Sequence, residues 1–311
     1  MTDEAFLRAR ERPADRPAEY PPLPEALVVP VYDDHTHLEI EDGVESLDYR
    51  EQLDRASSVG VRGVVQVGTD LRTSQWSADV ASREPRVLAA VGLHPEYAAE
   101  LVARGELDEH LAAIDELASR PRVRAIGETG LDFFRSGFEG HDAQVRSFEA
   151  HIEMAKQHGL ALQIHDRDAH REVVEVLQRV GAPERTVFHC FSGDAEFAQL
   201  VAEHGWYLSF AGTVTFKNAE PLREALQVVP RALLLVETDA PYLTPMPFRG
   251  RPNSAYMIPH TLRSMADTLG TDPSMLAAQI SSNSELVYGH WDDDPVTPPP
   301  GPFEPHEDAV G

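Results

Sequence analysis

The chain contains little cysteine and no long run of apolar residues. Its 311 residues include a single cysteine, Cys190, which excludes an internal disulfide framework and fits a reducing compartment. No apolar segment approaches the ~20 residues needed to cross a bilayer, and the first residues lack the apolar stretch of a secretory signal peptide. We therefore expect a cytoplasmic protein with no membrane partner.

Positive charge is also scarce. Lys156 and Lys217 are the only lysines, and the formal net charge is -25 with a pI near 4.8. This acidity argues against a protein that coats nucleic acid or lies on anionic lipid, since both need a basic surface. It does not exclude an enzyme that binds one or two terminal nucleotides, because local positive charge is sufficient there.

Both ends of the chain differ in composition from the middle. The first 26 residues carry five prolines among arginines and glutamates, with few apolar positions that could pack, and residues 291–311 are acidic and proline-rich. We expect a disordered arm at 1–26, one domain at 27–290 and a disordered tail at 291–311.

The middle of the chain alternates short apolar runs with longer amphipathic stretches. Apolar strands separated by helices are typical of a parallel sheet that is buried on both faces. Eight such units predict an α/β fold, a (β/α)8 TIM barrel. We expect strands at 27–32, 61–67, 87–92, 123–127, 161–164, 186–189, 206–210 and 233–236, and helices at 47–59, 107–119, 144–158, 172–180, 259–269 and 273–288.

Two histidines follow the first expected strand. Residues two apart in a strand share a face, so His35 and His37 point the same way and form half of a chelate for a divalent metal. Such a pair is weak as a signal when it stands alone. It gains weight because polar residues able to bind a metal follow six of the eight expected strands, where a TIM barrel places its active site.

The carboxylates among these residues indicate two metal ions. Desolvated like charges repel one another, and two divalent cations bridged by a carboxylate remove that cost. Glu128 is the candidate bridge. We expect the remaining ligands to divide between the two ions, with His35, His37 and Asp239 around one and His165 and His189 around the other.

Several of these residues also have plainer interpretations. His165 and His189 could be buried histidines bonded to backbone carbonyls, and Asp132 could cap the next segment or orient a ligand. His94 could stack on the preceding loop or hold the substrate. Arg167, two residues after His165, could pair with an acid of the rim, although an arginine at a metal-lined mouth also suits a substrate phosphate.

Six motifs together resemble the TatD family of metal-dependent hydrolases, and the resemblance extends over about residues 28–288. They are Asp-His-Thr-His-Leu at 34–38, Gly-Leu-His-Pro at 92–95, Ile-Gly-Glu-Thr-Gly-Leu-Asp at 126–132, His-Asp-Arg-Asp-Ala at 165–169, His-Cys-Phe-Ser-Gly at 189–193 and Glu-Thr-Asp-Ala-Pro-Tyr-Leu at 237–243. The resemblance implies a hydrolase barrel with two divalent ions held by His35, His37, Glu128, His165, His189 and Asp239. It also implies a deoxyribonuclease that trims DNA from the 3' end.

The leading hypothesis is therefore hydrolysis of a phosphodiester at a single-stranded DNA end. Asp239 and Glu128 would be the catalytic residues, with Asp239 accepting the proton of the attacking water. The expected phosphate-binding residues are His94, Arg167, Arg251 and Asn253. The ligand set leaves Mg²⁺, Mn²⁺ and Zn²⁺ open.

Two other functions remain possible from the sequence. One is an ester or amide hydrolase, such as the D-aminoacyl-tRNA deacylase activity associated with some TatD relatives. The other is a non-enzymatic metal-binding protein whose acidic ends recruit a partner. The ligand set disfavours the second, since a structural zinc site is complete with four protein ligands.

Overall fold

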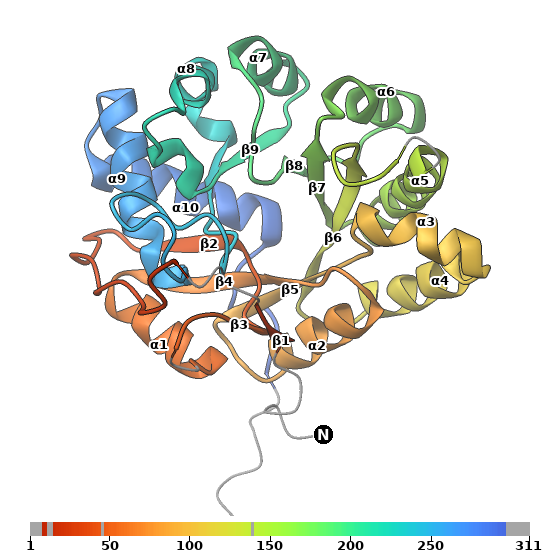
Figure 1. Cartoon of the computed structure of the whole chain (residues 1–311), viewed down its shortest axis with the longest axis horizontal. Helices are drawn as coiled ribbons and strands as arrows, with labels where there is room; N and C mark the ends of the chain where they lie inside the picture. The colour runs from red at the N-terminus through yellow and green to blue at the C-terminus, as the bar shows by residue number, and fades with distance from the viewer. Residues whose placement is uncertain (1–7, 11–14, 45–46, 138–139, 297–311) are drawn as a thin grey trace, which may run out of the picture.

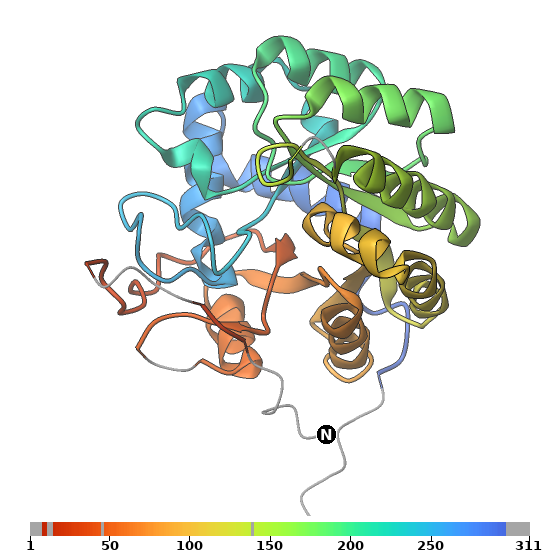
Figure 2. The same ribbon diagram turned by 45° about the vertical axis from the view of Figure 1, so that its right-hand side comes forward.

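The structure is a computed structural model that describes residues 8–10, 15–44, 47–137 and 140–296. Eight parallel strands form a barrel in chain order, surrounded by helices (Figures 1 and 2). Thr36, at the end of the first strand, forms a parallel bridge with Ala240, four residues after the last strand, and the predicted TIM barrel is thereby nearly closed. The strands are β2 (Val31–Thr36), β4 (Val61–Val67), β5 (Val87–Val91), β6 (Val123–Asp132), β7 (Ala161–Arg167), β8 (Thr186–Phe188), β9 (Tyr207–Phe210) and β10 (Leu234–Val236).

The helices cover the outer faces of the strands, and their apolar sides form the larger part of the core. Four of them begin at an aspartate whose carboxylate accepts backbone N–H groups of the first turn: Asp48, Asp70, Asp194 and Asp272. The helices are α1 (Tyr49–Ser58), α2 (Leu71–Ala81), α3 (Pro95–Arg104), α4 (Leu107–Ala118), α5 (His141–His158), α6 (His170–Val180), α7 (Ala195–Glu203), α8 (Glu220–Val228), α9 (Ile258–Leu269) and α10 (Pro273–Tyr288).

The first barrel strand begins four residues later than we predicted and includes His35. Every residue of β2 is buried, although four of its six side chains are polar or charged. Some of these polar groups are tolerated because the chain provides hydrogen-bond partners for them. Asp33, for example, accepts hydrogen bonds from the backbone nitrogen and the hydroxyl of Thr238. Apolar content alone therefore misplaces this strand.

The N-terminal arm also differs from the predicted disorder. β1 (Arg8–Ala9) pairs in parallel with β3 (Ile40–Glu41). Further along, the hydroxyl of Tyr256 donates to the backbone oxygen of Pro21, at 2.7 Å. Backbone groups hold the arm in place, and composition gives no sign of such bonds. Residues 1–7 and 11–14 of the predicted arm lie outside the described residues.

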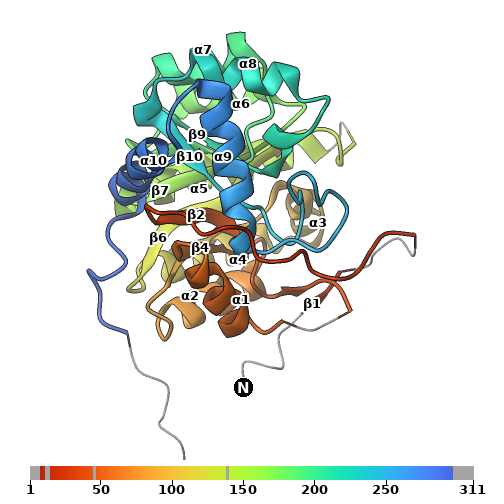
Figure 3. The same cartoon turned by 90° about the vertical axis from the view of Figure 1, so that its left-hand side faces the viewer.

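The beginning of the predicted tail packs against the barrel as well. The Trp291 ring stacks on Tyr32 with 3.8 Å between the ring centroids. Arg122, a fully buried residue, donates to the backbone oxygens of Trp291 and Asp294. Figure 3 shows this segment and α10 on one side of the molecule and β1 on the other. Residues 297–311 of the predicted tail lie outside the described residues, and no described helix is long and apolar enough to span a membrane.

Candidate metal centre

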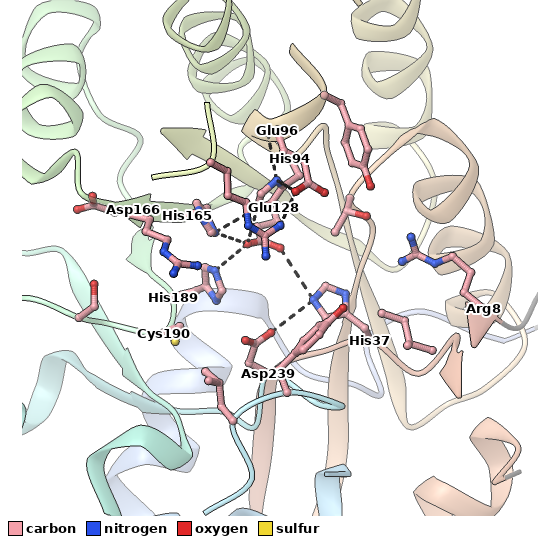
Figure 4. A pocket seen from close by; sticks show the side chains of 18 residues that line it. Arg8, His37, His94, Glu96, Glu128, His165, Asp166, His189, Cys190 and Asp239 are labelled. Atoms are coloured by element: carbon pink, nitrogen blue, oxygen red, sulfur yellow. Dashed lines mark hydrogen bonds and ion pairs between the residues drawn. The ribbon is translucent and has the colours of Figure 1, made fainter. Parts of the chain in front are cut away.

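Side chains from the carboxyl ends of the strands meet in a pocket of about 450 Å³ (Figure 4). The barrel dictates this arrangement, because parallel strands deliver all of their carboxyl ends to the same face. Of the predicted ligands, His37, Glu128, His165, His189 and Asp239 line the pocket. His35 is fully buried directly behind them.

Glu128 lies at the centre of this cluster. Its Oε1 is 2.7 Å from His165 Nδ1 and 2.9 Å from His189 Nε2. Its Oε2 is 3.8 Å from His35 Nε2 and 3.9 Å from His37 Nε2. One carboxylate thus presents each of its oxygens to a different pair of imidazoles, which is the arrangement expected of a ligand that bridges two ions.

The first pair of imidazoles has nitrogens that face each other. His35 Nε2 and His37 Nε2 are 3.3 Å apart, and Asp239 Oδ1 is 3.5 Å from His37 Nε2. His37 Nδ1 lies 3.0 Å from the Val67 carbonyl oxygen, which can only accept a proton, so Nδ1 donates and Nε2 is the nitrogen that faces the cluster. Two imidazole nitrogens that face each other beside a carboxylate fit a cation, and these three residues form a compact group of metal-binding side chains.

The second pair of imidazoles is oriented by buried acids. His165 Nε2 is 3.0 Å from Asp132 Oδ2, and His189 Nδ1 is 3.3 Å from Glu237 Oε1. Carboxylates that hold the far nitrogen of a ligating histidine fix the direction of its ring. Asp132 also accepts the backbone nitrogen of Arg135, at 2.8 Å, so it both caps the loop and orients His165.

The ionisation of the cluster follows from burial and from these contacts. Burial raises the pKa of a carboxylate, but the charge of the neighbouring His189 and the hydrogen bonds from His165 and His189 outweigh this effect and hold the pKa of Glu128 well below its usual value. Burial lowers the pKa of His94 to about 4. The central carboxylate is therefore ionised, while the histidine beside it is a neutral imidazole.

Two residues that follow strand ends have unusual backbone angles. Asp239 has φ of 50° and Cys190 has φ of 43°, which is uncommon for residues with a side chain and is found mostly at functional sites. Burial, together with the acidic Asp239, raises the pKa of the Cys190 thiol well above its usual value. The thiol is therefore neutral, in keeping with the absence of Cys190 from the catalytic residues predicted from the sequence.

The four predicted phosphate-binding residues separate into two groups. His94 and Arg167 line the pocket, and the Arg167 guanidinium lies 4.0 Å from the centre of the Phe134 ring. Arg251 and Asn253 are not among the described residues that line it. The Asn253 amide is buried and donates to the Thr238 backbone oxygen, at 3.1 Å, so this residue holds the loop after β10 instead of facing a ligand.

The sequence did not reveal several residues of the pocket wall. They come from the N-terminal arm, from loops and from the first turn of α3, and no periodicity marks them as pocket residues. Tyr242 could have been found, because it lies within one of the six motifs. The residues missed are Arg8, Thr69, Glu96, Tyr97, Arg135 and Tyr242.

A TIM barrel whose strand ends surround a central carboxylate with imidazoles is typical of a metal-dependent hydrolase. Comparison with known proteins agrees with this class. Residues 32–289 match the family described as "TatD related DNase". The chain belongs to the TatD family of metal-dependent hydrolases.

Individual relatives resemble nearly the whole barrel. A Mycobacterium tuberculosis protein named "Uncharacterized metal-dependent hydrolase TatD" is 42% identical over 262 residues, which cover 83% of this chain and 97% of the relative. The Escherichia coli K12 protein named "3'-5' ssDNA/RNA exonuclease TatD" is 35% identical over 240 residues, covering 75% and 90%. The crystal structure of the TatD homologue YJJV from the same organism superimposes with a TM-score of 0.76 at 25% identity, covering 83% and 97%.

Proposed function

We propose that this protein is a divalent-metal-dependent exonuclease that removes nucleotides from the 3' ends of single-stranded DNA. The position of Glu128, with one oxygen toward each pair of imidazoles, carries the proposal. It is the arrangement that phosphodiester cleavage between two ions requires. The name of the E. coli relative, "3'-5' ssDNA/RNA exonuclease TatD", supports the same substrate class.

The residues present fit two ions. His35, His37 and Asp239 would hold one ion, His165 and His189 the other, and Glu128 both. Such ions supply Lewis acidity, which lowers the pKa of water and stabilises charge on the phosphate and on the leaving oxygen. Mixed nitrogen and oxygen ligands are compatible with Mg²⁺, Mn²⁺ or Zn²⁺.

The protein's own side chains would position the reactants. The Asp239 side chain is 15% exposed at the pocket surface, where its free oxygen can accept the proton of an attacking water. Arg167 would donate paired hydrogen bonds to the phosphate oxygens, and neutral His94 would add a single one. Asp132 and Glu237 would hold the rings of His165 and His189 in a fixed orientation.

The overall acidity of the chain sets the expected size of this binding site. A net charge of -25 repels a long strand, so binding would depend on the arginines of the pocket. We therefore expect contact with only a few phosphates at a strand end, and a shallow dependence of affinity on salt. With one cysteine in the chain, we place this activity in a reducing cytoplasm.

The test uses protein stripped with a chelator and then reloaded with Mg²⁺, Mn²⁺ or Zn²⁺. Single-stranded oligonucleotides labelled at either end are the substrates, and Glu128→Ala is the blank. We expect metal-dependent shortening from the 3' end that the blank does not show. Failure to cleave any nucleic acid with any of the three metals would reject the proposal, and the loaded protein would then be assayed on aminoacyl esters and amides.

A further inference from the structure

The N-terminal arm reaches the metal centre although it lies outside the family match, which begins at residue 32. Arg8, on the arm, lines the same pocket as Glu128 and His165. Figure 4 shows Arg8 on one side of the central cluster and Asp166 on the opposite side. The pocket therefore has a cationic wall that the family barrel alone does not supply.

Backbone pairing and an ion pair together place the Arg8 guanidinium. The backbone nitrogen of Arg8 donates to the backbone oxygen of Glu39 at 2.8 Å, beside the pairing of β1 with β3. Its Nη2 lies 2.6 Å from Glu39 Oε1, and the other oxygen of this fully buried carboxylate accepts Gln66 Nε2 at 2.8 Å. Because Glu39 is itself held on both sides, the guanidinium has a fixed position before any substrate arrives.

Arg8 has N–H donors that the described residues leave unused. A guanidinium has five N–H donors, and Glu39 takes one through Nη2. The buried Nε has no hydrogen-bond partner among the described residues, while the side chain as a whole is 34% exposed. Because Nε is buried, the part of Arg8 that a ligand oxygen can reach is the exposed portion of the side chain at the pocket edge. A guanidinium bonded to one carboxylate oxygen can still donate there to a phosphate.

On the basis of the proposed function, we propose that Arg8 binds a second phosphate of the substrate strand, next to the phosphate held by Arg167 and His94. The guanidinium fork matches phosphate oxygens, and its charge offsets the repulsion between a nucleic acid and a strongly acidic protein. The arm would thereby make the enzyme prefer strand ends with two or more phosphates over an isolated diester.

A purely structural role for Arg8 is the competing explanation. Arg8 would then only neutralise buried Glu39 and anchor the arm. Arg10 provides the matched control, since it lies on the same arm, is 3.3 Å from Asp42 Oδ2 and donates to the Pro241 oxygen at 2.8 Å. Arg10 is not among the described residues that line the pocket. Loss of an arm anchor would affect Arg8→Gln and Arg10→Gln alike, whereas loss of a phosphate contact would affect only Arg8→Gln.

The experiment measures binding by fluorescence anisotropy over a range of salt concentrations. The full chain, loaded with Mg²⁺, is titrated with a labelled cleavage-resistant phosphorothioate trinucleotide and with a labelled mononucleotide. We expect Arg8→Gln to weaken trinucleotide binding by about tenfold and mononucleotide binding by less than about twofold. The slope of log affinity against log salt should fall by about 0.7, as for one lost phosphate contact to a single strand.

The variants Arg8→Lys and Arg10→Gln separate charge from anchoring. Arg8→Lys should keep the salt slope and recover part of the affinity, because lysine retains the charge without the fork. Arg10→Gln should keep the wild-type ratio between the two ligands. The proposal would be overturned if Arg8→Gln lost the same affinity for both ligands or left the salt slope unchanged. It would also be overturned if Arg10→Gln weakened trinucleotide binding selectively, as Arg8→Gln is expected to do. In each case Arg8 would be only an arm anchor.

A parallel cleavage assay distinguishes this proposal from the proposed activity. The substrates are the unmodified trinucleotide and bis(4-nitrophenyl) phosphate, which has a single phosphate. If wild-type protein cleaves neither substrate, yet Arg8→Gln weakens trinucleotide binding more than mononucleotide binding, the exonuclease assignment fails and the phosphate site stands. If it cleaves both and Arg8→Gln changes their KM values equally, the activity stands and the phosphate site fails.

Discussion

The two ends of the barrel differ in the side chains that they bury. At the carboxyl end of the strands, buried acids and imidazoles crowd around Glu128, and buried Glu237 Oε2 has no hydrogen-bond partner among the described residues. At the amino end, Tyr32, Trp291 and Tyr288 belong to an apolar cluster that fills the barrel. Arg122, which is buried at that end, donates to four backbone oxygens, although its Nε has no hydrogen-bond partner among the described residues.

This difference separates the requirements of chemistry from those of stability. Buried charges that await a ligand are costly to the folded state, whereas stacked rings and satisfied donors stabilise it. Substitutions at the carboxyl end should therefore change activity more than stability, and substitutions at the amino end should do the reverse. The variants below test that division.

The largest expected effect is that of Glu128→Ala at the carboxyl end. Loss of the central carboxylate should lower kcat/KM by about 1,000-fold or more, because neither of the two proposed ions would keep its full set of ligands. The metal-free variant should unfold at a lower temperature than metal-free wild type, because the buried imidazoles of His165 and His189 lose the carboxylate that they face. Steady-state kinetics, metal content and thermal unfolding measure the three quantities. Retention of more than about a tenth of the activity would contradict the central role of Glu128.

The amino end should respond in the opposite way to Trp291→Ala. The Trp291 ring stacks on Tyr32, and its Nε1 donates to the Val64 oxygen at 3.3 Å. Truncation should cost about 3 kcal/mol of unfolding free energy, while kcat/KM of the folded protein changes by less than about twofold. Denaturant unfolding and kinetics at low temperature measure both, with Trp291→Phe as the milder control. A large loss of activity without a loss of stability would show that the two ends are coupled.

The sequence predicts the carboxyl end of the barrel well, for a physical reason. Strand ends in a parallel barrel converge, so ligand-type residues such as His35, Glu128 and Asp239 are brought together by topology alone. No side-chain detail is needed for that inference. The barrel prediction is confirmed by the strand order, while the assignment of these residues as metal ligands stays a prediction.

The remaining features depend on contacts that composition does not encode. Arg8 meets Glu39 across 31 residues of chain, and Arg122 meets Trp291 across 169. Neither pair belongs to a periodic pattern, so the two ends of the chain appear in the sequence only as proline-rich or acidic segments. Asn253 illustrates the same limit, because an amide that holds a loop and an amide that holds a ligand look identical in the sequence.

His151 is a buried imidazole that is not a predicted metal ligand, so its effect on stability can be compared with that of the predicted ligands. His151 on α5 donates from Nδ1 to the Ser147 oxygen at 2.7 Å and accepts the Leu93 backbone nitrogen at Nε2, at 3.0 Å. Only the neutral ring can make both bonds. Burial lowers the pKa of His151 to about 4, so this histidine is protonated more readily in the unfolded chain than in the folded one.

The sign of the pH effect follows from that difference. The unfolded state binds more protons between pH ~6.5 and pH ~4, so the contribution of His151 is complete above this window and is lost as the pH falls through it. Between pH 7 and pH 5 we expect wild type to lose about 2 kcal/mol more than His151→Gln. Urea unfolding of both proteins at the two pH values measures the difference. Parallel losses would show that His151 does not titrate in this window.

The smallest effect concerns the two arginines that the sequence placed together as phosphate-binding residues. Arg167 lines the pocket, whereas the Arg251 guanidinium lies 5.9 Å from the centre of the Phe248 ring and its residue is not part of the described pocket wall. Arg167→Gln should raise KM for an oligonucleotide by about tenfold, as for one lost charged hydrogen-bond pair, and Arg251→Gln by less than about twofold. Both changes remove one positive charge, so a purely long-range effect would alter the two KM values equally. Steady-state KM values at low and high salt distinguish a direct contact from long-range attraction. If Arg167 contacts the phosphate, the KM values of the two variants still differ at high salt, whereas long-range attraction is screened there.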